Sequence, residues 1–502
     1  MLVLSVAALD VQMEKNWSNL ALVVSFMVVG LSVLLKALRG LNGWYYERKA
    51  GELRSSLPPG DMGWPIIGNM WFFLRCFKSG NPDSFISSFV TRFGRTGVYR
   101  AFMFGSPTIL VTTPETCKEV LMDDQHFKPG WPSSTVELMG RKSFVGISFD
   151  EHKRLRRLTH APVNGPEALS TYLGYIEKIV TSSLENWAES GPVEFLTELR
   201  RFTFKIIMRI FLGLESNSVL VSLEREFSAL NYGVRAMAIN IPGFAFHRAL
   251  KARKRLVSIL QSIVDARRKR NYTDTDSGEK DMMDRLMEAE DENGRKLTDE
   301  EIIDILVMYL NAGHESSAHV TMWGTLLLEE HPDVYQKAKV EQEMIIKNRP
   351  AGQKGLTMQE IKRMEYLNMV TDEALRWVSF SSAVFREATD NVKINGYTVP
   401  KGWKVQVWLR NVHKDSEVYA EPLKFDPSRW EGLTPRAGAF VPFGGGSRLC
   451  PGNELAKLEI SVFLHYFLRG YSIQRLNPNS ALMYLPHPRP VDNCMAKIRK
   501  LS

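Results

Sequence analysis

The sequence contains few cysteines, and none of them forms a close pair. Cys76, Cys117, Cys450 and Cys494 are the only four in 502 residues, and no CxxC pair occurs. Disulfide-rich domains and zinc ribbons both need closely and regularly spaced cysteines. The pattern therefore argues against both, and it favours a reducing compartment for the folded part.

The sequence also lacks linkers, internal repeats and nucleotide-binding motifs. No Ser/Gly/Pro-rich tract divides the chain, and no GxGxxG is present. Hydrophobic residues make up 44% and charged residues 24% of the chain, which is typical of a globular protein with ample core material. We therefore expect one large catalytic unit that does not bind a dinucleotide itself.

No nucleic-acid-binding motif accompanies the positive charge. The formal net charge is +8, and the clearest basic runs are Arg248–Arg255 and Ala266–Arg270. Both runs fit a solvated helical face, with an acidic partner or an anionic membrane surface as the alternative. We expect no nucleic-acid partner.

Charge is absent from one segment near the amino terminus. Trp17–Leu35 holds nineteen residues and no charged one. At about 1.5 Å per residue, a helix of this length covers about 28 Å, which is enough to span the apolar core of a bilayer. A cleaved signal peptide is the alternative, but the apolar run is long for one and no small-x-small cleavage site follows it. The segment therefore predicts a single membrane anchor.

Charges flanking this segment predict its orientation. Lys36 and Arg39 follow it directly, whereas Asp10 and Glu14 precede it. The positive-inside rule then places residues 1–16 in the lumen and the catalytic body in the cytosol. Residues 36–69 are basic and end in the Pro/Gly-rich "LPPGDMGWPIIGN", which predicts a stiff, turned hinge before a domain at 70–502.

The rest of the chain predicts a mainly α fold with small β-sheets. Residues 96–113 and 394–408 are rich in β-branched and aromatic residues around turn signals, so we expect strands there. Most segments between them have apolar residues at three- and four-residue spacing, which is typical of amphipathic helices.

Cys450 follows three glycines and precedes a predicted helix. The stretch reads "PFGGGSRLCPG" and is followed by "NELAKLEISVFLHYFLRG". Glycines permit close approach of the backbone to a flat ligand, and free N–H groups at a helix start stabilise a thiolate. Arg448 adds a positive charge that could pair with an anionic group. A lone cysteine in a glycine loop is nevertheless more often an idle thiol.

A second segment combines a helix with polar residues in its middle. We expect a helix from about Leu297–Asp299, with Thr298 or Asp299 as its cap. Polar residues between Asn311 and Ser317 interrupt an otherwise apolar run, and their burial costs free energy unless they are hydrogen-bonded. A kinked core helix is the alternative to a functional site.

The cysteine loop resembles the haem-binding signature of the cytochrome P-450 family, FxxGxRxCxG. Phe443, Gly446, Arg448, Cys450 and Gly452 fill all of its positions. The resemblance covers the whole chain and implies that Cys450 is the axial thiolate ligand of haem b iron. Phe443, Arg448 and Gly452 are then expected to bind the cofactor, together with His152, Arg156, Ala312, Gly313 and Arg386 from other parts of the chain.

Three further motifs are similar to marks of this family. The resemblance implies a buried triad of Glu373, Arg376 and Arg429 that supports the haem loop, although a pair at i and i+3 is by itself usually exposed. It implies oxygen activation at Ala312, Gly313, Glu315, Ser316 and Ser317, with Glu315, Ser316 and Ser317 catalytic. Ser316 stands where most members have threonine, so the hydroxyl is kept but its rotamer is less fixed.

The third of these motifs is the basic segment "EHKRLRR". Arg156 matches the arginine of the family's W-x-x-x-R, and His152 replaces the tryptophan. Arg156 and Arg448 are then the expected partners of the haem propionates, with Arg386 as a third.

The resemblance implies a monooxygenase that uses O2 and NADPH through a separate NADPH–cytochrome reductase at the endoplasmic reticulum membrane. Several segments look like the plant clan that oxidises gibberellin, brassinosteroid and triterpenoid precursors, and most like its members that act on the diterpene ent-kaurenoic acid. A β-amyrin-type triterpene oxidase is the close alternative, and a membrane haem carrier or sensor is the alternative of another class.

The expected substrate-facing segments are mostly apolar, as a bulky terpenoid requires. They are Trp131–Val145, Asn231–Phe246, Val307–Ala312, Phe380–Phe385 and Met483–Leu485. Arg235, in the second of them, could pair with a substrate carboxylate or lie on the surface.

Overall fold

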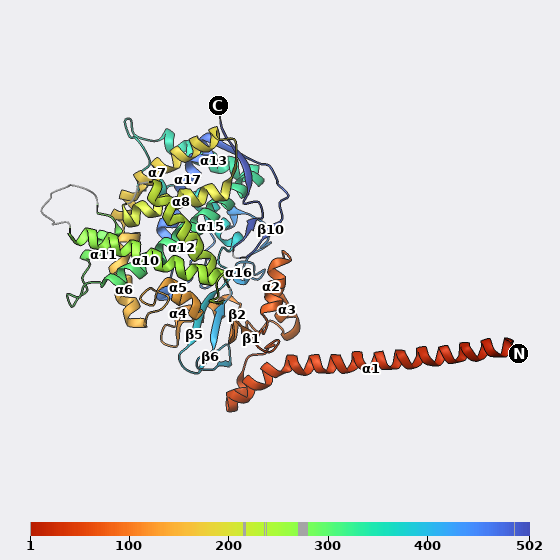
Figure 1. The fold of residues 1–502 in the computed structure, drawn as a ribbon. Helices are drawn as coiled ribbons and strands as arrows, with labels where there is room; N and C mark the ends of the chain where they lie inside the picture. Colours follow the sequence, from red (N-terminus) through yellow and green to blue (C-terminus); the bar gives the residue numbers. More distant parts are fainter. Residues whose placement is uncertain are drawn as a thin grey trace.

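A computed structural model describes residues 2–213, 217–234, 236, 238–269, 280–485 and 487–501. Helices make up most of the body, and one long helix extends away from it (Figure 1). The helices are α1 (Leu2–Ala50), α2 (Met70–Lys78), α3 (Ser84–Phe93), α4 (Pro114–Met122), α5 (Ser133–Met139), α6 (Phe149–Asn164), α7 (Pro166–Glu189), α8 (Phe195–Leu212), α9 (Asn217–Val234), α10 (Ala245–Lys269), α11 (Met282–Glu288), α12 (Asp299–Glu330), α13 (Pro332–Lys347), α14 (Met358–Lys362), α15 (Glu365–Val378), α16 (Leu409–His413) and α17 (Asn453–Gly470). Three 3-10 helices are η1 (Gly51–Ser56), η2 (Pro427–Trp430) and η3 (Gly446–Arg448).

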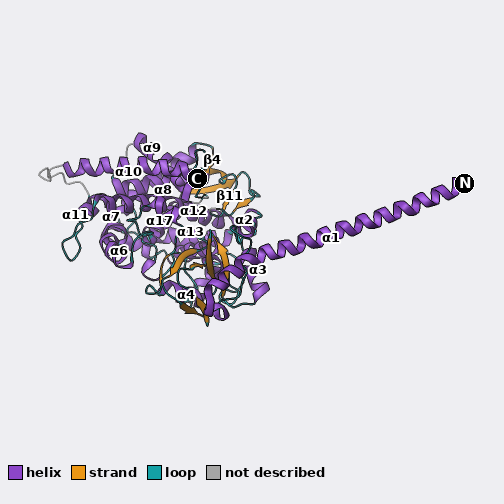
Figure 2. Cartoon of the chain, turned by 60° about the horizontal axis from the view of Figure 1, so that its bottom comes forward, coloured by secondary structure: helices purple, strands orange, loops and turns teal. Residues whose placement is uncertain are grey.

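The strands are short and form small sheets (Figure 2). They are β1 (Val98–Met103), β2 (Ser106–Val111), β3 (Phe127–Pro129), β4 (Pro192–Glu194), β5 (Val384–Ala388), β6 (Val392–Ile394), β7 (Tyr397–Val399), β8 (Lys404–Val407), β9 (Tyr471–Arg475), β10 (Leu482–Met483), β11 (Arg489–Pro490) and β12 (Met495–Lys500). The described sheets have the strand orders β1-β2-β8-β5-β3, β4-β12-β9, β6-β7 and β10-β11. The predicted mainly α fold with small sheets is confirmed.

The predicted anchor lies within α1, which runs as a single rod away from the body (Figure 1). By length and composition, the described part of the chain has one helix fit to cross a membrane, at Val24–Ser56. The helix continues into the segment expected to be a hinge, because no proline interrupts it before Ala50. The turned part is confined to the Pro/Gly-rich residues 57–69.

The last turns of α1 contact the body. Arg39 pairs with Asp61 at 2.6 Å, and Asp61 also accepts from Arg92 at 2.8 Å. The Asn42 amide donates to the backbone oxygen of Trp64 at 2.6 Å. The arginines and the backbone N–H of Gly63 lower the pKa of Asp61 against the effect of burial, so the pair stays charged.

The longest helix of the body, α12, begins with the predicted cap. Thr298 accepts from the backbone N–H of Glu301 at 3.3 Å, and the Glu301 carboxylate accepts from the backbone N–H of Thr298 at 2.8 Å. Between Glu301 and Leu328, all residues are buried except Ala312, Gly313 and Ser316. A helix buried on nearly all sides is thus open at one place, within the predicted oxygen-activating stretch.

Candidate functional site

Cys450 lies between η3 and α17, two residues before the helix cap Gly452. Its backbone N–H donates to the oxygen of Phe443 at 2.9 Å, which closes the loop. Burial raises the pKa of the Cys450 thiol, while the backbone N–H of Gly452 and the charge of Arg156 act in the opposite direction. Two neighbouring groups therefore favour the thiolate form of Cys450. A bound metal cation would stabilise the thiolate further and offset the cost of burying its charge.

Close packing and backbone conformation both require a glycine at position 446. Its φ is +67°, and a Cβ there would lie 2.1 Å from the backbone oxygen of Leu121 at the end of α4. Any side chain would push the loop off α4. The sequence predicted only room for a flat ligand, and the structure adds this contact with the body.

Four groups named from the sequence gather near Cys450 on three separate segments. His152 and Arg156 lie on α6, Arg386 on β5 and Arg448 on η3. Burial and the charges of the three arginines lower the pKa of His152 to about 3, so its ring is neutral. Burial and the positive charges of Arg386 and Arg156 lower the pKa of Arg448 to about 10. Burial is the larger cause of both shifts, and the mutual repulsion that adds to it indicates a concentration of positive charge.

This charge has no ion-pair partner within the part of the chain that the structure describes, although the negative charge of Asp124 acts on Arg386 and Arg448. Neither Arg156 nor Arg386 nor Arg448 makes an ion pair there, and Arg448 donates only to the backbone oxygen of Phe144, at 3.3 Å. The neighbours of Arg156 on α6 are different, because Arg154 pairs with Glu301 and Arg157 with Glu292. Of the three arginines in this basic segment, the one predicted to bind an anion is the one without an ion pair in the described part of the chain.

These residues fit the haem that the resemblance implies. Haem b carries two propionate carboxylates, which three unpaired guanidinium groups would neutralise. The Cys450 sulfur would serve as the soft axial ligand of the iron. No group of three or more His, Cys, Asp or Glu that could cage a metal occurs among the described residues.

The open part of α12 presents small groups. Ser316 donates its hydroxyl to the backbone oxygen of Ala312 at 3.0 Å, the bond expected for a serine in a helix. A Cβ on Gly313 would lie 3.1 Å from Ile207 of α8, so this glycine permits close packing of two helices.

Glu315 is buried and reaches towards α8 and α9. Arg200 donates to one carboxylate oxygen from Nη2 at 2.7 Å and from Nε at 3.2 Å, and Asn231 donates to the other at 3.3 Å. His319, one turn along α12, has Nδ1 3.6 Å from the same carboxylate. Sequence reasoning missed Arg200, because nothing in the sequence links it to a residue 115 positions away.

Ser317 lies beside a second buried carboxyl group, that of Glu459 on α17. Glu459 is 1% exposed, and neither of its oxygens has a well-formed hydrogen bond in the described part of the chain. Burial raises the pKa of Glu459 to about 8, and the Ser317 hydroxyl only partly opposes this shift. Glu459 is therefore largely protonated at neutral pH, and sequence reasoning missed it as well.

Glu373, Arg376 and Arg429 come together as the resemblance implies. One oxygen of Glu373 accepts from Arg376 at 2.8 Å and from Arg429 at 2.9 Å, and the other accepts from Trp430 at 3.1 Å. Glu373 and Arg376 are both fully buried. Arg376 also donates to the backbone oxygens of His413 and Pro422, at 2.7 and 2.8 Å. These bonds compensate for the burial of charge.

Two of the expected substrate-facing segments meet through an aromatic contact. The rings of Trp131 and Phe385 lie 5.2 Å apart. His487, next to the segment Met483–Leu485, stacks on Phe380 at 3.7 Å. Arg235 lies outside the described residues.

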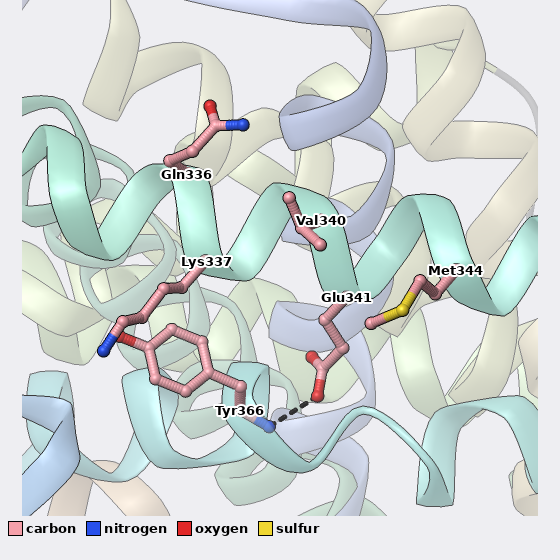
Figure 3. Close-up of a pocket in the computed structure, with 6 residues that line it drawn as sticks. All are labelled: Gln336, Lys337, Val340, Glu341, Met344 and Tyr366. Carbon is pink, nitrogen blue, oxygen red and sulfur yellow. Dashed lines mark hydrogen bonds between the residues drawn. The ribbon is translucent and has the colours of Figure 1, made fainter.

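A surface hollow of about 390 Å³ lies elsewhere, between α13 and the start of α15. Figure 3 shows its lining, in which the backbone N–H of Tyr366 donates to Glu341 at 2.6 Å. None of the predicted site residues contributes to it. The lining residues are Gln336, Lys337, Val340, Glu341, Met344 and Tyr366.

Comparisons with known proteins agree with this geometry. The Cytochrome P-450 family pattern matches residues 58–488. Ent-kaurenoic acid oxidase 2 of Arabidopsis thaliana is 61% identical over 94% of this chain and 97% of its own. The 7,8-epoxymelianol synthase CYP88A154 of Ailanthus altissima is 53% identical over 98% of this chain and 99% of its own. Among solved structures, the retinoic acid bound cyanobacterial CYP120A1 superposes with a TM-score of 0.79 at 29% identity, covering 89% of this chain and 99% of that one.

Proposed function

The chain belongs to the cytochrome P-450 family, as its motifs predicted, and on this premise we propose that it is a haem-thiolate monooxygenase that oxidises ent-kaurenoic acid in successive steps to the first gibberellin. One observation carries the haem-thiolate part. Arg156, Arg386 and Arg448 converge near the half-buried Cys450 without an ion pair in the described part of the chain.

The residues of the chain would divide the work as follows. Cys450 would hold the haem iron, and the arginines and the neutral His152 would receive the rest of the macrocycle. When bound, haem supplies the activation of O2 that lets a C–H bond be hydroxylated. The protein binds and orients the substrate and controls when protons arrive.

Glu315 and Ser316 would deliver those protons. They are adjacent in α12, and Ser316 lies on its open face while Glu315 reaches towards α8. Ser316 now donates to Ala312, and rotation of this hydroxyl would redirect its proton into the site. A haem carrier or sensor needs no such pair, which favours an oxygenase over that alternative.

The substrate is proposed from the relatives. Identity to the ent-kaurenoic acid oxidase is 61%, against 53% to the 7,8-epoxymelianol synthase, with nearly complete coverage in both. The apolar segments around Phe385 fit a bulky terpenoid. A β-amyrin-type triterpene oxidase is the alternative, since small changes in such pockets alter specificity.

We also propose a location and an electron source. The apolar helix α1 and the positive charges that follow its span fit a single-pass anchor in the endoplasmic reticulum with the body in the cytosol. The chain has no GxGxxG fingerprint, so electrons from NADPH would come from a membrane-bound NADPH–cytochrome reductase.

Product analysis tests this function. The full chain is reconstituted with reductase, NADPH and either ent-kaurenoic acid or β-amyrin. We expect oxidised products from the diterpene acid alone. Turnover of only β-amyrin would replace the proposed substrate with the alternative, and a holoenzyme that consumes neither substrate would contradict both.

A further inference from the structure

We propose that His413 is a positioning residue of the cysteine loop, holding the loop entrance at Val441 in register with the end of α15. His413 ends α16, is fully buried, and has a hydrogen bond at each ring nitrogen. The inference rests on the haem-thiolate role of Cys450 and does not depend on which substrate is oxidised.

Hydrogen bonding fixes the tautomer of His413. The backbone N–H of Val441 can only donate, and it lies 3.1 Å from Nε2, so Nε2 carries no proton. Nδ1 then carries the proton and donates to the hydroxyl of Ser379 at 2.9 Å. That hydroxyl in turn donates to the backbone oxygen of Arg376 at 2.9 Å. In this series of hydrogen bonds from Val441 through His413 and Ser379 to Arg376, each donor has one acceptor. The N–H of Val441 sets the direction of every bond in the series.

The imidazole stays in this neutral form at physiological pH. Burial and the nearby charges of Arg376 and Arg410 lower the pKa of His413 to about 3. A protonated ring would place a second N–H against that of Val441. The low pKa therefore keeps an acceptor in front of the Val441 N–H.

Two more backbone bonds continue from Val441 to Cys450. The oxygen of Val441 accepts from Gly444 at 3.0 Å, and the oxygen of Phe443 accepts from Cys450 at 2.9 Å. The first bond forms the turn that begins the loop, and the second fixes the backbone of the thiol residue. His413 is thus the contact from outside the loop at the point where this series begins.

His413 is also tied to the buried triad. Its own backbone oxygen accepts from Arg376 at 2.7 Å, and its ring lies 5.8 Å from that of Phe440. Phe440 in turn packs on Trp430 at 4.6 Å, and Trp430 donates to Glu373. The residue connects the triad to the loop through its ring and through its backbone.

Two amide substitutions separate the two ring contacts. In His413→Gln, the amide oxygen reaches the position of Nε2 and still accepts from Val441. In His413→Asn, the amide nitrogen takes the position of Nδ1 and donates to Ser379, but Val441 loses its acceptor. Ser379→Ala removes the other contact and is the matched control.

The readout is the spectrum of the reduced, carbon-monoxide-bound holoenzyme, in which thiolate ligation gives a distinct band. We expect the wild type, His413→Gln and Ser379→Ala to keep this band. In His413→Asn, the ratio of the form with the thiolate band to the form whose band lies at shorter wavelength should fall about tenfold. Amide hydrogen exchange at Val441 and Gly444 should be about tenfold faster.

Equal behaviour of the Gln and Asn variants would overturn the proposal, whether both keep the band or both lose it. If His413→Asn does not accumulate as folded protein, His413→Gln decides alone. Retention of the thiolate band by the Gln variant then supports the proposal, and a folded Gln variant without the band contradicts it. Neither result depends on turnover, so failure of the proposed substrate would leave this test intact.

Discussion

Arg200 on α8 donates two hydrogen bonds to a single carboxylate oxygen of Glu315 on α12, at 2.7 and 3.2 Å. This ion pair holds the acid of the proposed proton relay away from the open face of α12, where Ser316 lies. To deliver a proton to the site, the Glu315 carboxylate would first take up a proton and then leave Arg200 or pass the proton through an intermediary. We therefore expect Arg200 to influence proton delivery.

The first prediction concerns this pair. Glu315→Gln keeps a polar side chain but cannot supply a proton, so product formation should fall about a hundredfold. Arg200→Met should give a smaller loss, because the acid remains but is no longer positioned. Both should keep the spectral shift on binding substrate, and product formed per NADPH consumed is the measurement.

Arg201 is the control for Arg200. It is the next residue on α8, and its partner is Glu198 on the surface, at 2.6 Å. Arg201→Met should leave the amount of product formed per NADPH consumed unchanged. An equal loss in Arg200→Met and Arg201→Met would show that the effect comes from α8 as a whole and not from contact with Glu315.

The second prediction concerns haem retention. Arg156 has no ion pair in the described part of the chain, whereas its neighbour Arg157 pairs with Glu292. Arg156→Gln removes one charge-assisted bond to a propionate, so haem transfer to a competing haem-binding protein should become about tenfold faster. Arg157→Gln should transfer haem at the wild-type rate, and a faster rate there would assign the effect to general loss of positive charge on α6.

The third prediction uses two pairs with the same spacing. Glu373 and Arg376 are three residues apart and fully buried, while Glu198 and Arg201 are three apart and exposed at 26% and 54% of their side chains. Glu373→Gln leaves two buried guanidinium groups without their anion, so the free energy of unfolding should fall by about 3–5 kcal/mol. Glu198→Gln should cost no more than about 1 kcal/mol. Chemical unfolding of both variants measures the difference.

Motifs explain which parts of the site could be predicted from the sequence. The residues of the motifs that contain Cys450, Glu373 and Arg376 lie close together in the sequence, so each motif identifies its residues directly. Arg156 was predicted within a basic segment, but only the partners of Arg154 and Arg157 explain why it is the arginine there that is available for an anion.

Long-range partners were not predictable. Arg200 and Asn231 meet Glu315 from helices far away in the sequence, and an arginine on an amphipathic helix normally indicates a solvated face. Nothing in the sequence distinguished His413, since its proposed role depends on Val441, 28 residues later. The fold was easier to predict because apolar spacing is a local pattern repeated in every helix.

The last prediction follows from the buried carboxyl of Glu459. Its pKa in the folded protein is about 8, above the ordinary value of 4.5, so the folded state binds one more proton than the unfolded state between these pH values. The free energy of unfolding should therefore fall as pH rises through this window, by up to about 1.4 kcal/mol per pH unit from this group. Glu459→Gln removes the dependence, whereas His152 and His413 contribute equally to both proteins. Urea unfolding at several pH values between 5 and 8 should show the variant gaining stability relative to the wild type as pH rises. A constant difference would mean that Glu459 is ionised in the folded protein.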